Sequence, residues 1–158
     1  MRREFLMILV AMLGVSAMAE AVDGDGAQYL GGTMPLVEKA EGKLTTNSET
    51  AMRFTPNKKN QPSFEIPYST ITELEYGQKA GRRVAVAVLV SPLALFSKKR
   101  NHYLTITYND AAGKEQTGVF ELGKDIVRIT LKIVEVRSGK DIQYQDEEAR
   151  KHSGMAAK

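Results

Sequence analysis

Short segments in which apolar and polar residues alternate follow one another over residues 42–122, and this period of two constrains the fold more than any other feature. The clearest pair is His102–Tyr108 (HYLTITY) and Glu115–Leu122 (EQTGVFEL), on either side of the turn sequence NDAAG at 109–113. Two alternating segments joined by a short turn indicate a β-hairpin. The sequence therefore predicts a fold built mainly from antiparallel strands.

Further strands are expected around this hairpin. Those on its N-terminal side are Lys43–Thr46, Ala51–Thr55, Ser63–Tyr68, Thr70–Tyr76 and Val84–Val90, and a last short one is Asp141–Tyr144. Pro67 has no N–H to donate, so Ser63–Tyr68 is predicted to be an edge strand or to contain a bend. An exposed edge strand can accept one more strand from a partner.

The segment 124–137 (KDIVRITLKIVEVR) has conflicting signals. Its β-branched residues alternate as in a strand, but Asp125 near its start and Ser138–Gly139 after its end are helix boundary signals. As a helix it has a buried stripe of Val127, Leu131 and Val134 with Ile126, Ile133 and Val136 beside it. We expect an amphipathic helix that closes the open end of a barrel, followed by a polar helical turn at Asp146–His152.

The first residues have the pattern of an export signal. Arg2 and Arg3 precede the apolar run Phe5–Leu13, and Ala17–Met18–Ala19 is a small-x-small cleavage site. Phe5–Ala19 is shorter than the roughly 20 apolar residues of a membrane span, which disfavours the alternative of an uncleaved anchor. We expect residues 1–19 to be removed and the protein to be periplasmic or extracellular.

One folded domain is expected in the rest of the chain. Its parts are a flexible lead-in at 20–28, the domain at 29–145 and a polar helical or disordered tail at 146–158. Without the leader the chain has 158 − 19 = 139 residues, enough for one hydrophobic core. The chain has no cysteine, so neither disulfides nor a lipid-modified cysteine is available, and packing alone must stabilise this core.

Residues suited to catalysis are few. There is no cysteine nucleophile, no G-x-S-x-G motif and no phosphate-binding glycine loop, and the two histidines are His102 and His152. Glu147 and Glu148 are neighbours, and neighbours on a helix point in different directions. The sequence therefore predicts a protein that is not an enzyme, with no catalytic residues, metal site or cofactor. The net charge after cleavage, (22 − 2) − (19 − 1) = +2, is too small to indicate a nucleic-acid partner.

The segment 82–100 (RRVAVAVLVSPLALFSKKR) has two interpretations. In the first it is a buried strand, Val84–Val90, followed by a turn or short helix that begins with Pro92. In the second it is a membrane-contacting loop, in which Leu93, Leu95 and Phe96 enter a bilayer. The candidate lipid- or ligand-binding residues beside that loop are Lys98, Lys99, Arg100 and His102.

Four segments resemble those of exported, largely uncharacterised bacterial proteins with a pleckstrin-homology-like barrel. They are GKLTT, SFEIPYSTITELEYG, KKRNHYLTITY and KDIVRITLKIVEVRSGK, and the resemblance covers about residues 29–151. It implies a small antiparallel β-barrel or sandwich closed by a helix, with a binding or scaffolding role. The expected partner is a protein or peptide in the cell envelope, and the alternative is an anionic membrane surface bound through the basic residues 98–100.

Overall fold

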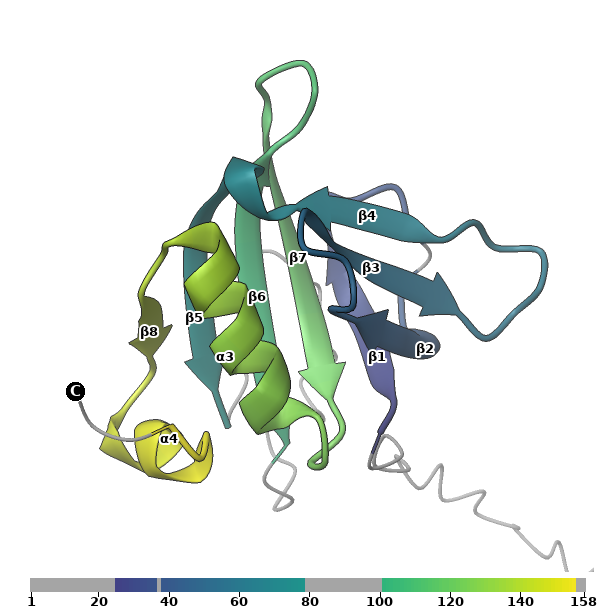
Figure 1. The fold of residues 1–158 in the computed structure, drawn as a ribbon. Helices are drawn as coiled ribbons and strands as arrows, with labels where there is room; N and C mark the ends of the chain where they lie inside the picture. Colours follow the sequence, from purple (N-terminus) through teal and green to yellow (C-terminus); the bar gives the residue numbers. More distant parts are fainter. Residues whose placement is uncertain (1–24, 37, 79–100, 156–158) are drawn as a thin grey trace, which may run out of the picture.

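A computed structural model describes residues 25–36, 38–78 and 101–155. Its strands form one eight-stranded sheet in the order β4-β3-β2-β1-β7-β6-β5-β8, and the sheet curls into a half-barrel (Figure 1). The strands are β1 Ala27–Gly32, β2 Ala40–Thr45, β3 Ala51–Pro56, β4 Phe64–Pro67, β5 Ile71–Gly77, β6 His102–Asn109, β7 Glu115–Leu122 and β8 Ile142–Tyr144. Neighbouring strands are antiparallel except β5 and β8, which are parallel. A mainly β fold, as predicted, is confirmed.

The hairpin of β6 and β7 shows how the local sequence sets the register. Asp110 accepts hydrogen bonds from the backbone N–H groups of Ala112 and Lys114, both at 2.9 Å, and these bonds fix the turn. The strands then pair from Asn109 opposite Glu115 to His102 opposite Leu122. The hairpin predicted from alternation and turn residues is therefore present.

The core lies on the concave side of the half-barrel and is rich in aromatic rings. The ring of Phe120 in β7 lies 5.5 Å from that of Tyr29 in β1 and 5.6 Å from that of Phe54 in β3, between ring centroids. Such tilted pairs add to the burial of apolar area that stabilises a core. Tyr29 is fully buried, and this burial raises the pKa of its hydroxyl to about 12.

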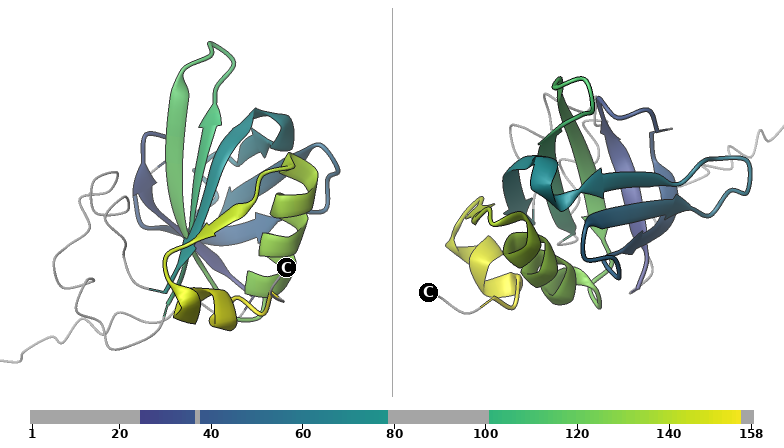
Figure 2. Two further views of the ribbon diagram at one scale, coloured as in Figure 1. Left: turned by 90° about the vertical axis from the view of Figure 1, so that its left-hand side faces the viewer. Right: turned by 45° about the horizontal axis from the view of Figure 1, so that its top comes forward.

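The segment with conflicting signals forms helix α3, Val127–Ser138, which lies against the open side of the half-barrel (Figures 1 and 2). It buries Val127, Thr130, Leu131 and Val134. Gly139 ends it in the left-handed conformation with φ 67°, and its N–H donates to the Glu135 carbonyl. Val136, expected beside the buried stripe, is 66% exposed. It lies on the far side of the helix, so that part of the helix prediction was wrong.

The N-terminal boundary also differs from the prediction. Strand β1 begins at Ala27, so Ala27 and Gln28 belong to the sheet rather than to a flexible lead-in. Both residues pair with β2 on one side and with β7 on the other. These strands are distant in the sequence, so the local sequence around Ala27 and Gln28 does not indicate that the two residues belong to a strand. The predicted strand Val84–Val90 lies outside the described residues.

Two short helices complete the described structure. The 3₁₀ helix η1, Tyr68–Thr70, turns the chain from β4 into β5. Helix α4, Glu147–His152, occupies the segment expected to form a polar helical turn, and the Asp146 carboxylate accepts a hydrogen bond from the Ala149 N–H at 2.7 Å. A curled β-sheet with short helices places the chain in a small α+β class.

Candidate functional site

Strand β4 forms one edge of the sheet, with β3 as its neighbour. The prediction of an edge strand within Ser63–Tyr68 is therefore confirmed for Phe64–Pro67. Pro67 is the last residue of the strand, where its missing N–H costs little pairing energy. The edge is the described feature that best matches the binding role inferred from the sequence.

The hydrogen-bond pattern shows which backbone groups this edge presents. The Tyr68 N–H donates to the Thr50 carbonyl at 2.9 Å, which makes these two residues a hydrogen-bonded pair. In an antiparallel ladder such pairs alternate with pairs whose backbone groups point away. With Ile66 opposite Met52 and Glu65 opposite Arg53, the alternation directs the N–H and C=O of Glu65 away from β3.

The side chains of β4 separate the core face from the solvent face. Ile66 is buried, and the half-buried Phe64 ring makes an edge contact with Tyr108 at 6.3 Å between centroids. On the other face the Nε of Arg53 donates to Glu65 Oε1 at 2.7 Å across the strand pair. This bond holds the Glu65 side chain over β3, away from the edge, and leaves its outward backbone groups accessible to a partner.

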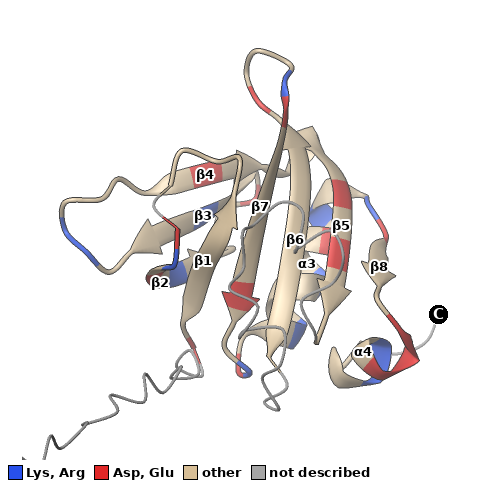
Figure 3. Cartoon of the chain, turned by 180° about the vertical axis from the view of Figure 1, so that it is seen from behind, with Lys and Arg blue, Asp and Glu red and all other residues tan. Residues whose placement is uncertain are grey.

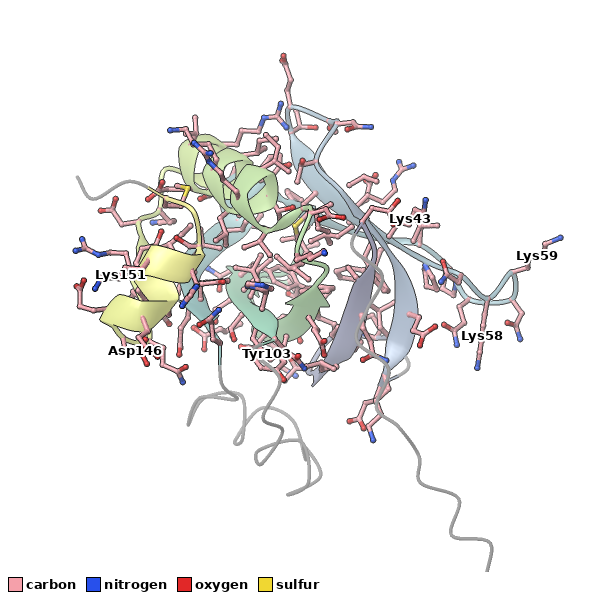
Figure 4. The ribbon with its side chains drawn as sticks, turned by 90° about the horizontal axis from the view of Figure 1, so that it is seen from below. Lys43, Lys58, Lys59, Tyr103, Asp146 and Lys151 are labelled. Carbon is pink, nitrogen blue, oxygen red and sulfur yellow. The ribbon has the colours of Figure 1, made fainter. Side chains whose placement is uncertain are left out.

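The loop before β4 is polar and basic. Lys58 and Lys59 are exposed and extend from the end of this loop, away from the body of the protein (Figure 4). The view coloured by charge shows the same basic loop tip in blue and a red, acidic segment within β4, which contains Glu65 (Figure 3). A partner strand on β4 would therefore lie beside a positively charged end.

A contact that the sequence did not predict fixes the other end of this edge. Arg137, in the last turn of α3, donates from Nη1 to the carbonyls of Thr46 and Ser48, at 2.5 and 2.7 Å. Its guanidinium also lies over the Tyr68 ring, 5.5 Å from the centroid. These bonds attach the helix to the β2–β3 turn and to η1, and so hold the corner at which β4 ends.

His102, a candidate ligand-binding residue, opens strand β6 and contacts Tyr76 of β5. Its Nδ1 and the Tyr76 hydroxyl share a hydrogen bond of 2.5 Å, and the two rings stack with centroids 6.1 Å apart. Burial lowers the pKa of His102, and the nearby His152 lowers it further. Both effects favour the neutral imidazole. This imidazole takes part in packing β5 against β6, and a ligand-binding role for it stays a prediction.

The remaining candidate residues, Leu93, Leu95, Phe96, Lys98, Lys99 and Arg100, lie outside the described residues. Within the described ranges, no helix is long and apolar enough to cross a membrane. In the same ranges, no three histidine or acidic side chains gather in a way that could hold a metal ion.

No protein-family model matches the chain, and no curated protein matches it significantly.

Proposed function

We propose that this protein is a non-enzymatic, exported binding module that holds an extended segment of a protein partner in the cell envelope. The segment adds to the sheet as a further strand along β4. The observation that supports this proposal is the outward direction of the Glu65 N–H and C=O at the sheet edge. Backbone hydrogen bonds provide the affinity in such strand addition, and side chains beside the edge provide the specificity.

The edge is suited to a short and selective contact. β4 has four residues, and the Thr70 hydroxyl donates to the Pro67 carbonyl at 2.9 Å, which uses that acceptor within the chain. A short edge that ends in proline also limits uncontrolled pairing between copies of a protein. We therefore expect the partner to pair around Glu65 and to extend toward the basic loop.

The test replaces Glu65 in two ways. Glu65→Pro removes the outward N–H without removing a bond of the β3–β4 ladder, while the matched control Glu65→Ala loses the same carboxylate and keeps the N–H. Each variant is used to capture cross-linked partners from an envelope fraction at low and high salt. We expect Glu65→Pro to reduce capture by about tenfold or more and Glu65→Ala to retain most of it.

Two results would contradict strand addition at β4. One is equal capture by the proline and alanine variants when circular dichroism shows both to be folded. The other is binding to anionic vesicles that salt abolishes and that disappears when Lys98, Lys99 and Arg100 are changed to glutamate. The second result would support the alternative function, a membrane-surface binder.

Export is a separate part of this proposal and has its own measurement. If the leader is cleaved after Ala19, mass spectrometry of the released protein will give a mass and an N-terminal peptide that begin at Glu20. Retention of Met1 on a membrane-bound form would instead support the uncleaved anchor.

A further inference from the structure

The exposed side chains of helix α3 are of two chemical kinds. Within Val127–Ser138 they are two cations and two aliphatic groups, with no carboxylate among them: Arg128, Ile129, Lys132 and Val136. Ile129 and Val136, at 55% and 66%, are also the large hydrophobic side chains left exposed in the part of the chain that the structure describes. Exposed apolar groups that gather on one face often mark an interaction surface.

These four side chains share one face of the helix. Lys132 follows Ile129 by three residues and precedes Val136 by four, so it lies between the two aliphatic groups. Arg128 precedes Lys132 by four residues and borders the same face. The face is turned away from the sheet, because the opposite side of α3 is buried against it (Figures 1 and 2). We call these four residues the α3 outer face.

The charge of the α3 outer face is positive and is not balanced locally. In the described ranges, neither Arg128 nor Lys132 forms an ion pair. The acidic residue within α3, Glu135, is half-buried, and Asp125 lies before the helix. The stem of Arg128 lies beside the C-terminal segment, where a Cβ added to Gly154 would meet its Cδ at 3.2 Å. Both cations are therefore available to an anionic ligand.

We propose that the α3 outer face binds an anionic lipid membrane. Ile129 and Val136 enter the apolar boundary of the bilayer, and Arg128 and Lys132 contact the phosphate groups of the lipid heads. The long apolar stems of the two cations allow this arrangement, since they keep the charged groups at head-group level beside the inserted aliphatic side chains. The helix then lies parallel to the membrane plane, with the sheet behind it.

Charge and shape favour a membrane over a protein partner. A face with two cations and no exposed carboxylate is complementary to a surface of one sign, such as a layer of anionic head groups. Protein interfaces usually gain most of their binding energy from a few anchor side chains that fill pockets. The α3 outer face is the convex side of a single helix, and its aliphatic side chains can insert into a fluid bilayer without a matching pocket.

The small number of contacts predicts weak and reversible binding. A single myristoyl chain gives a membrane partition constant of about 10⁴ M⁻¹. Two cations and two partly inserted aliphatic side chains supply less, so we expect a constant on the order of 10³ M⁻¹ for anionic vesicles at low salt. Such binding would concentrate the protein at a membrane surface. It does not depend on the function proposed for β4.

The first test is co-sedimentation of the protein, as purified from expressing cells, with phosphatidylglycerol or phosphatidylcholine vesicles at about 0.1 to 10 mM lipid, a range that brackets the expected constant. The wild type should bind the anionic vesicles only. Lys132→Glu should weaken this binding by about tenfold or more, because it sets a negative charge against the head groups. Ile129→Gln should weaken it by about three- to tenfold, because it removes apolar contact without removing a core side chain. Lys59→Glu, on the β3–β4 loop, is the matched control for charge reversal and should bind within about twofold of the wild type.

The second test places a fluorescent reporter in the α3 outer face. The chain has no tryptophan, so one introduced residue gives the whole tryptophan signal. The emission of Ile129→Trp should shift to shorter wavelength when phosphatidylglycerol vesicles are added, because the indole ring leaves water for the membrane interface. Lys59→Trp, on the exposed β3–β4 loop, should show no shift.

Four results would overturn the proposal. The wild type could fail to bind phosphatidylglycerol over the whole range, or it could bind both lipids equally. Binding could also be unaffected by Lys132→Glu and Ile129→Gln, or the emission of Ile129→Trp could stay unshifted on bound protein. Capture of an acidic protein that Lys132→Glu abolishes, without vesicle binding, would assign the face to a protein partner instead.

Two further variants separate this site from the other proposed contacts. Loss of vesicle binding only when Lys98, Lys99 and Arg100 are changed to glutamate would assign the membrane contact to those residues and not to α3. Glu65→Pro should bind vesicles as the wild type does, so failure of strand addition and failure of membrane binding remain distinguishable.

Discussion

Replacing Leu131 with alanine should lower the free energy of unfolding by about 2 to 5 kcal/mol. Leu131 is fully buried, and it enters the hydrophobic core from α3. Truncation removes its apolar contacts and leaves a cavity beneath a helix that Arg137 holds in place at its C-terminal end. Because domains of this size are stable by only about 5 to 15 kcal/mol, the variant should be partly unfolded under mild conditions.

The adjacent residue gives a matched control. Lys132 is exposed, so Lys132→Ala should change stability by only about 0.5 kcal/mol. Urea denaturation followed by circular dichroism measures both variants. Equally small effects at the two positions would mean that α3 contributes little to the core.

Elements with local signals could be predicted from the sequence. The β6–β7 hairpin has alternating strands and an Asp110-led turn within a few residues of each other, so its register needs no distant partner. The sequence of α3 fits both the period of a strand and that of a helix, but it contains a clear signal for the C-terminal end of a helix. The left-handed conformation that Gly139 adopts is a helix stop, and burial at i, i+4 and i+7 outweighed the strand preference of the β-branched residues.

Elements that depend on distant partners could not be predicted. Strand β1 has weak alternation and ends in Gly31–Gly32, and it is ordered by pairing with β2 and β7, the second of which lies almost ninety residues later in the chain. Its side chains still reach the core, as the fully buried Tyr29 shows. A local pattern cannot report such non-local pairing.

The features of the candidate site also fall into two groups, one that local sequence signals indicate and one that depends on distant residues. Pro67 predicted either an edge strand or a bend, because proline is tolerated mainly where no partner needs its N–H, and β4 lies at the edge of the sheet. The contacts of Arg137 did not follow from its position in the last helical turn. Its acceptors, the Thr46 and Ser48 carbonyls, are 91 and 89 residues away in the sequence, so only the folded chain shows that the helix fixes the corner beside the edge.

Gly42 provides the second large expected effect, which is a steric one. It lies in β2, opposite Pro56 of β3 and Ala27 of β1. A Cβ added there would overlap the Thr55 carbonyl oxygen and lie 2.9 Å from Cζ of Phe54. The oxygen belongs to a paired strand and cannot move without breaking the β2–β3 ladder, so we expect Gly42→Ala to destabilise the fold by about 3 kcal/mol.

The sign of this effect distinguishes steric overlap from backbone propensity. In an ordinary strand, replacing glycine with alanine stabilises a protein by roughly 0.5 to 1 kcal/mol, because the unfolded chain loses freedom. Gly113→Ala, in the β6–β7 turn, is the matched control. Its added Cβ meets no atom within 4 Å, and its φ of 76° costs roughly 1 to 2 kcal/mol. Thermal and urea unfolding should therefore show that Gly42→Ala is less stable than Gly113→Ala. If Gly42→Ala were instead more stable than the wild type, β2 and β3 would not approach each other as closely as this packing requires.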